Sequence, residues 1–99
     1  MRAMAMQCDD RDNVAMLMET DVKAGSEVEV RNKEGKIQVR VANQDIPFGH
    51  KIALRPIAKG EDIIKYGECI GVATQEIAEG DYVHVHNLES KRGRGDLTA

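Results

Sequence analysis

Polar and apolar residues alternate over much of the chain, a pattern typical of short β-strands. The clearest alternation covers residues 27–31 and 36–41, separated by the polar residues 32–35, and this arrangement predicts a β-hairpin. Residues 14–18 form a short apolar run bounded by polar residues, which predicts a buried strand. A further strand is expected over residues 51–54. We therefore expect an all-β chain with scarcely a helix.

One seven-residue pattern predicts how the strands are connected. Each copy has an aliphatic residue, a glycine three positions later and a second aliphatic residue three positions after that, and the copies cover residues 22–28, 57–63 and 77–83. Glycine can adopt a positive φ without a steric clash, so each copy can turn sharply while both aliphatic residues reach the same core. The pattern predicts tight glycine turns between strands.

The third copy leads into residues 82–87, which carry two of the three histidines. We interpret this segment as a strand, in which Tyr82, His84 and His86 would share one face because side chains alternate. The two imidazoles would lie roughly 7 Å apart at about 3.4 Å rise per residue, which suits a metal, a carboxylate or a pair of proton-transfer groups. His50, in a loop that enters a strand, is the natural third member. The alternative is a solvated edge with incidental histidines.

Composition narrows the class of protein. The 99 residues, 41% hydrophobic and 31% charged, describe one small globular domain. A net charge of −3 with one Phe, two Tyr and no Trp argues against nucleic acid as a partner. Cys8 and Cys69 are too few and too far apart for a disulfide framework or a zinc site with close cysteine pairs. The sequence shows no signal peptide and no membrane span, so we expect a cytoplasmic protein.

Composition also changes towards both ends of the chain. We expect residues 1–11 to form a flexible lead, residues 12–88 to form the folded domain and residues 89–99 to form a basic, glycine-rich tail. Arg92 and Arg94 in this tail are candidates for contact with an acidic ligand. A three-histidine zinc site with water in its fourth position is a further possibility left open by the residues alone.

Six short motifs are more specific than these general patterns. They are DNVA at 12–15, IPFGHKIAL at 46–54, IAKG at 57–60, IKYG at 64–67, IGVAT at 70–74 and VHVHN at 83–87. Together, and in this order, they resemble the amino-terminal SAF domain of the altronate and galactarate dehydratase family. The resemblance covers residues 12–96, and it implies a compact β-clip fold, in agreement with the glycine turns.

The same resemblance implies an activity that this chain would share with a second chain. It implies the small subunit, or an excised amino-terminal domain, of a hydro-lyase that dehydrates a sugar acid to a 2-keto-3-deoxy acid. The partner would be a large dehydratase subunit, and the isolated chain would be inactive; a homo-oligomer is left open. Two alternatives stay open: the small subunit of a sulfolactate sulfo-lyase, which is similar to the same domain, and a non-catalytic carbohydrate- or partner-binding module.

The resemblance also suggests which residues meet the active site of the large subunit. His50, His84 and His86 are the expected catalytic residues, of which His84 or His86 would protonate the leaving group. The expected substrate-binding residues are Lys65, Tyr66, Asn87, Arg92 and Arg94. Iron(II) or manganese(II) is expected on the large subunit, and His84 and His86 are the candidates for any metal ligand in this chain.

Overall fold

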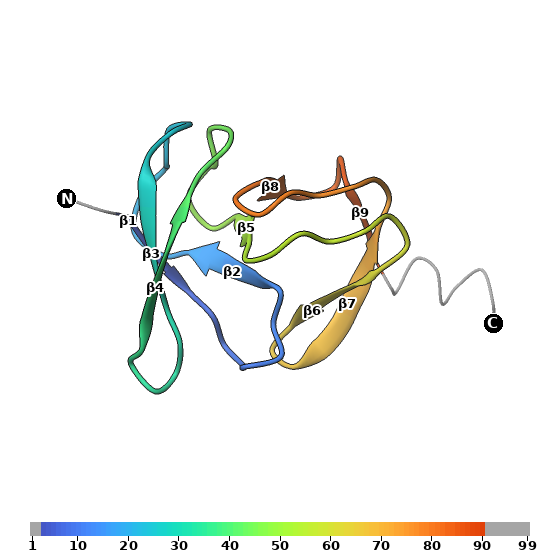
Figure 1. The fold of residues 1–99 in the computed structure, drawn as a ribbon, viewed down its shortest axis with the longest axis horizontal. Coiled ribbons are helices and arrows are strands. Elements are labelled where there is room, and N and C mark those ends of the chain that lie inside the picture. Colours follow the sequence, from blue (N-terminus) through green and yellow to red (C-terminus); the bar gives the residue numbers. More distant parts are fainter. Residues whose placement is uncertain (1–2, 91–99) are drawn as a thin grey trace.

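The computed structural model describes residues 3–90, which form nine β-strands and no helix (Figure 1). The strands are β1 (Ala3–Met6), β2 (Val14–Leu17), β3 (Glu27–Arg31), β4 (Ile37–Val41), β5 (Lys51–Ala53), β6 (Asp62–Lys65), β7 (Glu68–Ala73), β8 (Tyr82–Val83) and β9 (Leu88–Ser90). The all-β prediction is confirmed, and the fold is consistent with the β-clip of SAF domains. None of the described segments is a helix that could span a membrane.

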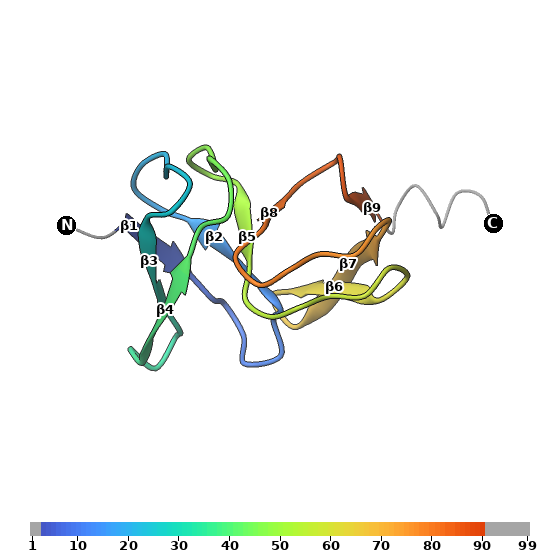
Figure 2. The same ribbon diagram turned by 45° about the horizontal axis from the view of Figure 1, so that its top comes forward.

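The strands form two sheets that lie side by side (Figure 2). The larger sheet has the order β4-β3-β1-β2-β5-β8, and the smaller has the order β6-β7-β9. Every strand pair is antiparallel except β1 and β3, which are parallel. The predicted hairpin is β3–β4, with Glu29 opposite Val39, and the predicted buried strand is β2.

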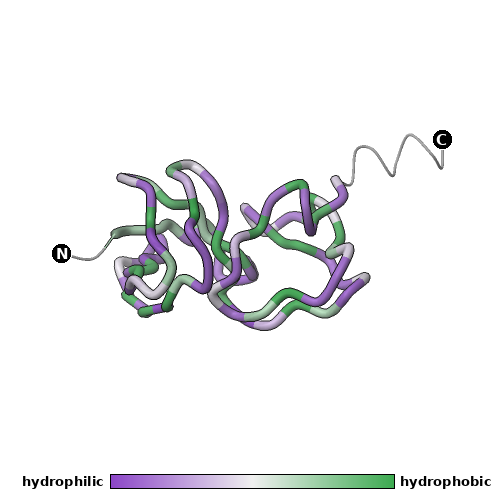
Figure 3. The backbone as a smooth tube through the Cα atoms, turned by 90° about the horizontal axis from the view of Figure 1, so that it is seen from above, coloured by the Kyte–Doolittle hydropathy of each residue, from purple (hydrophilic) through white to green (hydrophobic). Residues whose placement is uncertain are grey.

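Two hydrophobic clusters lie on opposite faces of strands β2, β5 and β8. Ala15 and Ile52 belong to the first cluster, whereas their chain neighbours Val14 and Ala53 belong to the second. This follows from the alternation of side chains across a strand. Figure 3 shows hydrophobic and hydrophilic residues interspersed along the whole tube. The second cluster also contains Ile63 and other residues from the segment that forms the smaller sheet. Strands β2, β5 and β8 therefore separate two cores.

The larger sheet leaves one apolar area uncovered. Its register aligns six residues on one face, one from each strand: Ile37, Arg31, Met6, Met16, Lys51 and Val83. The second hydrophobic cluster covers this face at Val83, which is fully buried. On β4, in contrast, Ile37, Val39 and Val41 are 51%, 39% and 50% exposed. The described residues therefore leave the β4 end of this face open.

The seven-residue pattern forms the predicted glycine turns. Gly25, Gly60 and Gly80 all have φ between 87° and 90°, the region that favours glycine. The structure also contains a fourth copy, residues 46–52, with Gly49 at φ 82°. The copies meet in pairs through isolated bridges between Val22 and Ile46 and between Ile57 and Ile77. The fourth copy, which the sequence analysis did not identify, carries His50.

The beginning of the chain differs from the expected flexible lead. Residues 3–6 form β1, which lies between β3 and β2 in the larger sheet. Ala5 is fully buried and pairs with Leu17. The physical reason is the alternation of Ala and Met over residues 3–6, which lets small side chains pack in the core. At the other end β9 extends to Ser90, and the expected tail with Arg92 and Arg94 lies outside the described residues.

Candidate functional site

Four aromatic side chains, His50, Tyr82, His84 and His86, form a cluster that we call the histidine group. Tyr82 lies at its centre: its hydroxyl oxygen is 2.6 Å from Nδ1 of His50. Its ring is nearly parallel to that of His84, with centroids 5.9 Å apart, and its centroid is 5.0 Å from that of His86. The centroids of His50 and His84 are 4.3 Å apart. The structure thus brings together all three histidines that the sequence singled out.

The segment that carries two of these histidines is a turn, so the strand expected over residues 82–86 is wrong beyond Val83. The backbone N–H of Asn87 donates to the carbonyl oxygen of His84 at 3.1 Å. The expected alternation fails with it, because Val83 is fully buried while Val85 is 78% exposed. His84 and His86 therefore gather around Tyr82 through a turn, and not through a shared strand face.

Asn87 is the physical cause of this turn. Its Oδ1 accepts a hydrogen bond from the backbone N–H of His84 at 3.0 Å, and its Nδ2 donates to the carbonyl oxygen of Tyr82 at 2.9 Å. Local side-chain hydrogen bonds of this kind compete with the ladder of a strand. The side chain of Asn87 is also buried. Asn87 thus holds the turn that carries His84 and His86, and its expected role in substrate binding stays a prediction.

Two lysines, Lys51 and Lys65, form a second feature, which we call the lysine pair. Lys51 on β5 is directly opposite Met16 on β2, and Nζ of Lys65 on β6 is 3.9 Å from Sδ of Met16. Both lysines are half-buried. No carboxylate among residues 3–90 forms an ion pair with either ammonium group. The lysine pair is therefore a local positive charge without a described counter-charge.

Electrostatic effects connect the two features. Burial and then the charge of Lys65 lower the pKa of Lys51. Burial also lowers the pKa of His84, and the charges of His50, Lys51 and His86 lower it further. Each of these positive charges disfavours the others. A bound anion would relieve this repulsion, so the surface is suited to an anionic ligand.

An acidic side chain borders the other end of the histidine group. Asp81 accepts hydrogen bonds from the side chains of Asn43, at 2.8 Å, and Gln44, at 3.1 Å. Burial acts to raise the pKa of Asp81, but hydrogen bonds from Ala78, Asn43 and Gln44 lower it overall. An open hollow of about 280 Å³ lies here, with Asp81, His86 and Gln44 in its lining. This hollow therefore combines an imidazole with a carboxylate, and neither lysine of the pair is in its lining.

The other predicted site residues lie elsewhere or cannot be placed. Tyr66 is 59% exposed in the turn between β6 and β7 and has a φ of 58°. Its ring contacts the ammonium group of Lys65, which is 4.7 Å from the ring centroid, and its backbone N–H donates to Asp12. Neither contact involves the histidine group. Arg92 and Arg94 lie outside the described residues.

Residues 3–90 do not supply a metal site. They contain no group of three or more His, Cys, Asp or Glu side chains arranged to hold a metal ion. In addition, Nδ1 of His50 is already bonded to the hydroxyl of Tyr82. The described part of the chain therefore does not form the three-histidine zinc site. The iron(II) or manganese(II), expected on the large subunit, stays a prediction.

Tyr82 and Lys51 are the members of this surface that the sequence analysis did not select. Lys51 immediately follows His50 in the fourth copy of the glycine pattern, and β5 pairs with β8 so that Lys51 is opposite Val83 and Ile52 is opposite Tyr82. This long-range pairing brings the two segments together. The fourth glycine copy was the available signal, because it relates residues 46–52 to residues 77–83.

Comparison with known proteins agrees with this architecture. The family model for the altronate/galactarate dehydratase SAF domain matches residues 3–91, so it includes β1. An altronate dehydratase of Escherichia coli (strain K12) is 47% identical over 79 residues, which are 80% of this chain and 15% of that protein. The galactarate dehydratase (L-threo-forming) of the same organism is 37% identical over 75 residues, or 13% of its length. The chain thus spans only a small part of these dehydratases.

A relative of similar length has a different name. The (2R)-sulfolactate sulfo-lyase subunit alpha of Chromohalobacter salexigens is 38% identical over 86 residues, which are 85% of this chain and 90% of that subunit. The same domain therefore occurs both as a small separate subunit and as a minor part of a much longer chain. All of these relatives carry the names of lyases.

Proposed function

Because this chain belongs to the altronate/galactarate dehydratase SAF domain family, we propose that it is the small subunit of a cytoplasmic hydro-lyase. Together with a large subunit, it would dehydrate a sugar acid to a 2-keto-3-deoxy acid. The observation that carries the proposal is the histidine group, which gathers three imidazoles around Tyr82 as proton-transfer groups, together with the lysine pair, a positive charge without a described counter-charge. The large subunit supplies the rest of the active site.

The steps of the reaction can be divided between this chain and the large subunit. Dehydration of a 2,3-dihydroxy acid requires removal of the proton next to the carboxylate, protonation of the departing hydroxyl and stabilisation of the enediolate. The lysine pair binds the substrate carboxylate, and His84 or His86 protonates the departing hydroxyl. Iron(II) or manganese(II) on the large subunit would stabilise the enediolate. The base that removes the proton also belongs to that subunit.

A second candidate function is the small subunit of a sulfolactate sulfo-lyase. The observation that favours it is the extent of the match, which covers 90% of a named alpha subunit. The lysine pair would suit this substrate as well, because a sulfonate is an anion like a carboxylate. The two candidates differ in the leaving group, which is water in one and sulfite in the other.

The test is reconstitution with a large dehydratase-like chain, sought first in the neighbouring reading frame. The two chains are mixed with iron(II) or manganese(II) under reducing conditions, and keto-acid formation from altronate and galactarate and sulfite release from sulfolactate are followed. Keto-acid formation supports the first candidate, and sulfite release supports the second. The absence of turnover on every one of these substrates would reject both, and binding of a sugar acid by the chain without turnover would indicate a binding module.

Variants of the lysine pair make this test specific. Lys51→Met and Lys65→Met should each raise KM at least about tenfold, because a hydrogen bond to a charged group contributes about 1.5–3 kcal/mol. Lys59→Met is the matched control, since the exposed Lys59 uses only its backbone N–H, which donates to Glu76. Equal KM values for all three variants would contradict carboxylate binding by the lysine pair.

A further inference from the structure

The contact between Tyr82 and His50 is a short side-chain hydrogen bond within the histidine group. The hydroxyl oxygen of Tyr82 lies 2.6 Å from Nδ1 of His50, at the short end of the range for O–H donors. Within the described residues, this imidazole nitrogen is the only hydrogen-bond partner of the hydroxyl. The bond therefore links one particular ring nitrogen of His50 to one particular donor.

Backbone hydrogen bonds fix the positions of both Tyr82 and His50 in the fold. The N–H of Tyr82 donates to Oε1 of Gln44 at 2.8 Å, and its carbonyl oxygen accepts from Asn87 at 2.9 Å. His50 donates its N–H to the carbonyl oxygen of Pro47 at 3.1 Å and accepts from the N–H of Leu17 at 2.9 Å. The ring of Tyr82 also packs against the first hydrophobic cluster. The geometry is therefore fixed by the fold.

The bond has a direction, which follows from the donors available. In a neutral imidazole one nitrogen carries a proton and the other accepts a hydrogen bond, while a phenol can do either. If Nδ1 of His50 carried the proton, the part-buried hydroxyl of Tyr82 would have no acceptor among the described residues. If the hydroxyl of Tyr82 donates instead, its proton bonds to Nδ1 of His50, which acts as the acceptor. The second arrangement satisfies both groups.

We propose that Tyr82 is a positioning residue that fixes the tautomer of His50, with Nδ1 as acceptor and the proton on Nε2. His50 then faces a ligand as a hydrogen-bond donor. Resting on the proposed function, this assigns His50 to the substrate carboxylate as a hydrogen-bond donor. In this tautomer His50 cannot act as the general base, because a protonated Nε2 has no lone pair to accept the substrate proton. Proton transfer is left to His84 and His86, whose ring centroids lie 5.9 Å and 5.0 Å from that of the same tyrosine.

Nuclear magnetic resonance of the isolated, ¹⁵N-labelled chain tests the tautomer without substrate or large subunit. The spectra are recorded near pH 8.5, where an imidazole with a pKa of about 6.5 is neutral. For wild type we expect an unprotonated Nδ1 and a protonated Nε2 on His50, and a Tyr82 hydroxyl proton protected enough to be observed. Tyr82→Phe should abolish the hydroxyl signal and shift the Nδ1 resonance of His50, because the donor is lost while the ring remains.

Tyr66→Phe is the matched control, because the exposed hydroxyl of Tyr66 has no contact with the histidine group and its removal should leave His50 unchanged. A protonated Nδ1 in the wild-type chain would overturn the proposal, and that measurement needs no variant to fold. So would an Nδ1 resonance that does not move in Tyr82→Phe. Neither result depends on turnover, so a failed reconstitution and a wrong tautomer are distinguished.

Discussion

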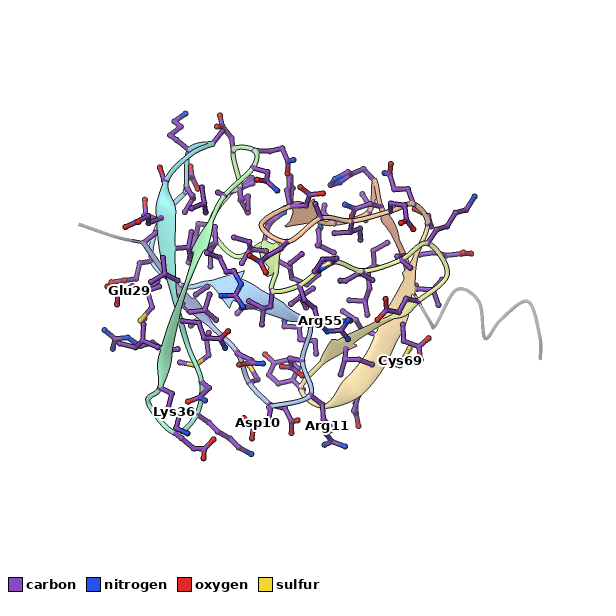
Figure 4. All side chains as sticks on the ribbon, viewed as in Figure 1. Asp10, Arg11, Glu29, Lys36, Arg55 and Cys69 are labelled. Carbon is purple, nitrogen blue, oxygen red and sulfur yellow. The ribbon has the colours of Figure 1, made fainter. Side chains whose placement is uncertain are left out.

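At the scale of single residues, Asp12 and Asn13 join the two sheets through their side chains. The carboxylate of Asp12 accepts backbone hydrogen bonds from Cys8 and Asp9 in its own loop and from Tyr66 and Gly67 in the turn between β6 and β7. Figure 4 shows that the neighbouring Asp10 and Arg11 instead project from this loop. Buried polar groups need such partners, which gives the DNVA motif a structural reason.

Removing the Asp12 carboxylate should destabilise the protein strongly. In Asp12→Ala, four part-buried backbone N–H groups lose their acceptor, and a fully buried group left unsatisfied costs about 1–3 kcal/mol. We therefore expect the free energy of unfolding, measured by urea denaturation, to fall by at least about 2 kcal/mol. Asp10→Ala is the control, because Asp10 is exposed and should change stability little. Similar midpoints for the two variants would contradict this role of Asp12.

The pKa of His84 should depend on the positive charge of Lys51, a member of the lysine pair. The positive charge of Lys51 contributes to lowering the pKa of His84, so Lys51→Met should raise that pKa towards the ordinary value of about 6.5. Because the pKa is lower in the folded chain than in the unfolded chain, the contribution of His84 to stability decreases as the pH falls from about 6.5 through the folded pKa. Titration of the imidazole resonances by NMR gives the measurement. A pKa of His84 that is the same in wild type and Lys51→Met would count against the coupling.

At the scale of elements, the glycine turns differ in what surrounds them. A Cβ on Gly80 would collide with the carbonyl oxygen of Val41, whereas a Cβ on Gly25 would meet nothing within 4 Å. Both residues have nearly the same positive φ, 90° for Gly80 and 88° for Gly25. The third glycine copy is therefore packed against the end of β4, while the first is open to solvent.

This contrast gives a prediction about two substitutions of the same type. Gly25→Ala should cost about 1–2 kcal/mol, which is the cost of placing an L-residue in the left-handed region. Gly80→Ala should cost clearly more, because the collision with Val41 is added to the same backbone strain. Thermal or urea unfolding of both variants measures the difference. Equal losses of stability would contradict this prediction, because they would mean that Val41 moves away from the new Cβ with no loss of free energy.

The elements that sequence predicted best were those specified locally. The hairpin β3–β4 has strict alternation and a short polar connection, so nearby residues determine it. The strand expected over residues 82–86 failed because the side chain of Asn87 bonds to the backbone and ends β8 at Val83. The fourth glycine copy was overlooked because Pro47 and Gly49 argue against a regular element. His50 and His84 lie close together because β5 pairs with β8, and the residue pattern within either segment does not predict this long-range pairing.

At the scale of the whole molecule, the two cores are built on common strands. Each of β2 and β5 sends alternate residues into different clusters, as Ile52 and Ala53 do. The histidine group lies where β5 begins and β8 ends, and the lysine pair joins β5 to β6 across Met16. The proposed ligand surface thus takes residues from both sheets, although its histidines come from only two short segments.

The shared strands also imply how the molecule should lose its structure. If the smaller sheet separated, Val14, Ala53 and Val83 would be exposed on strands whose other faces still support the first core, and the side chain of Asn13 would lose its bonds to Ile64 and Asp62. Neither sheet is therefore a self-sufficient folding unit. The chain should unfold in one cooperative step, and a ligand held at the ends of β5 and β8 would stabilise both sheets together through mass action.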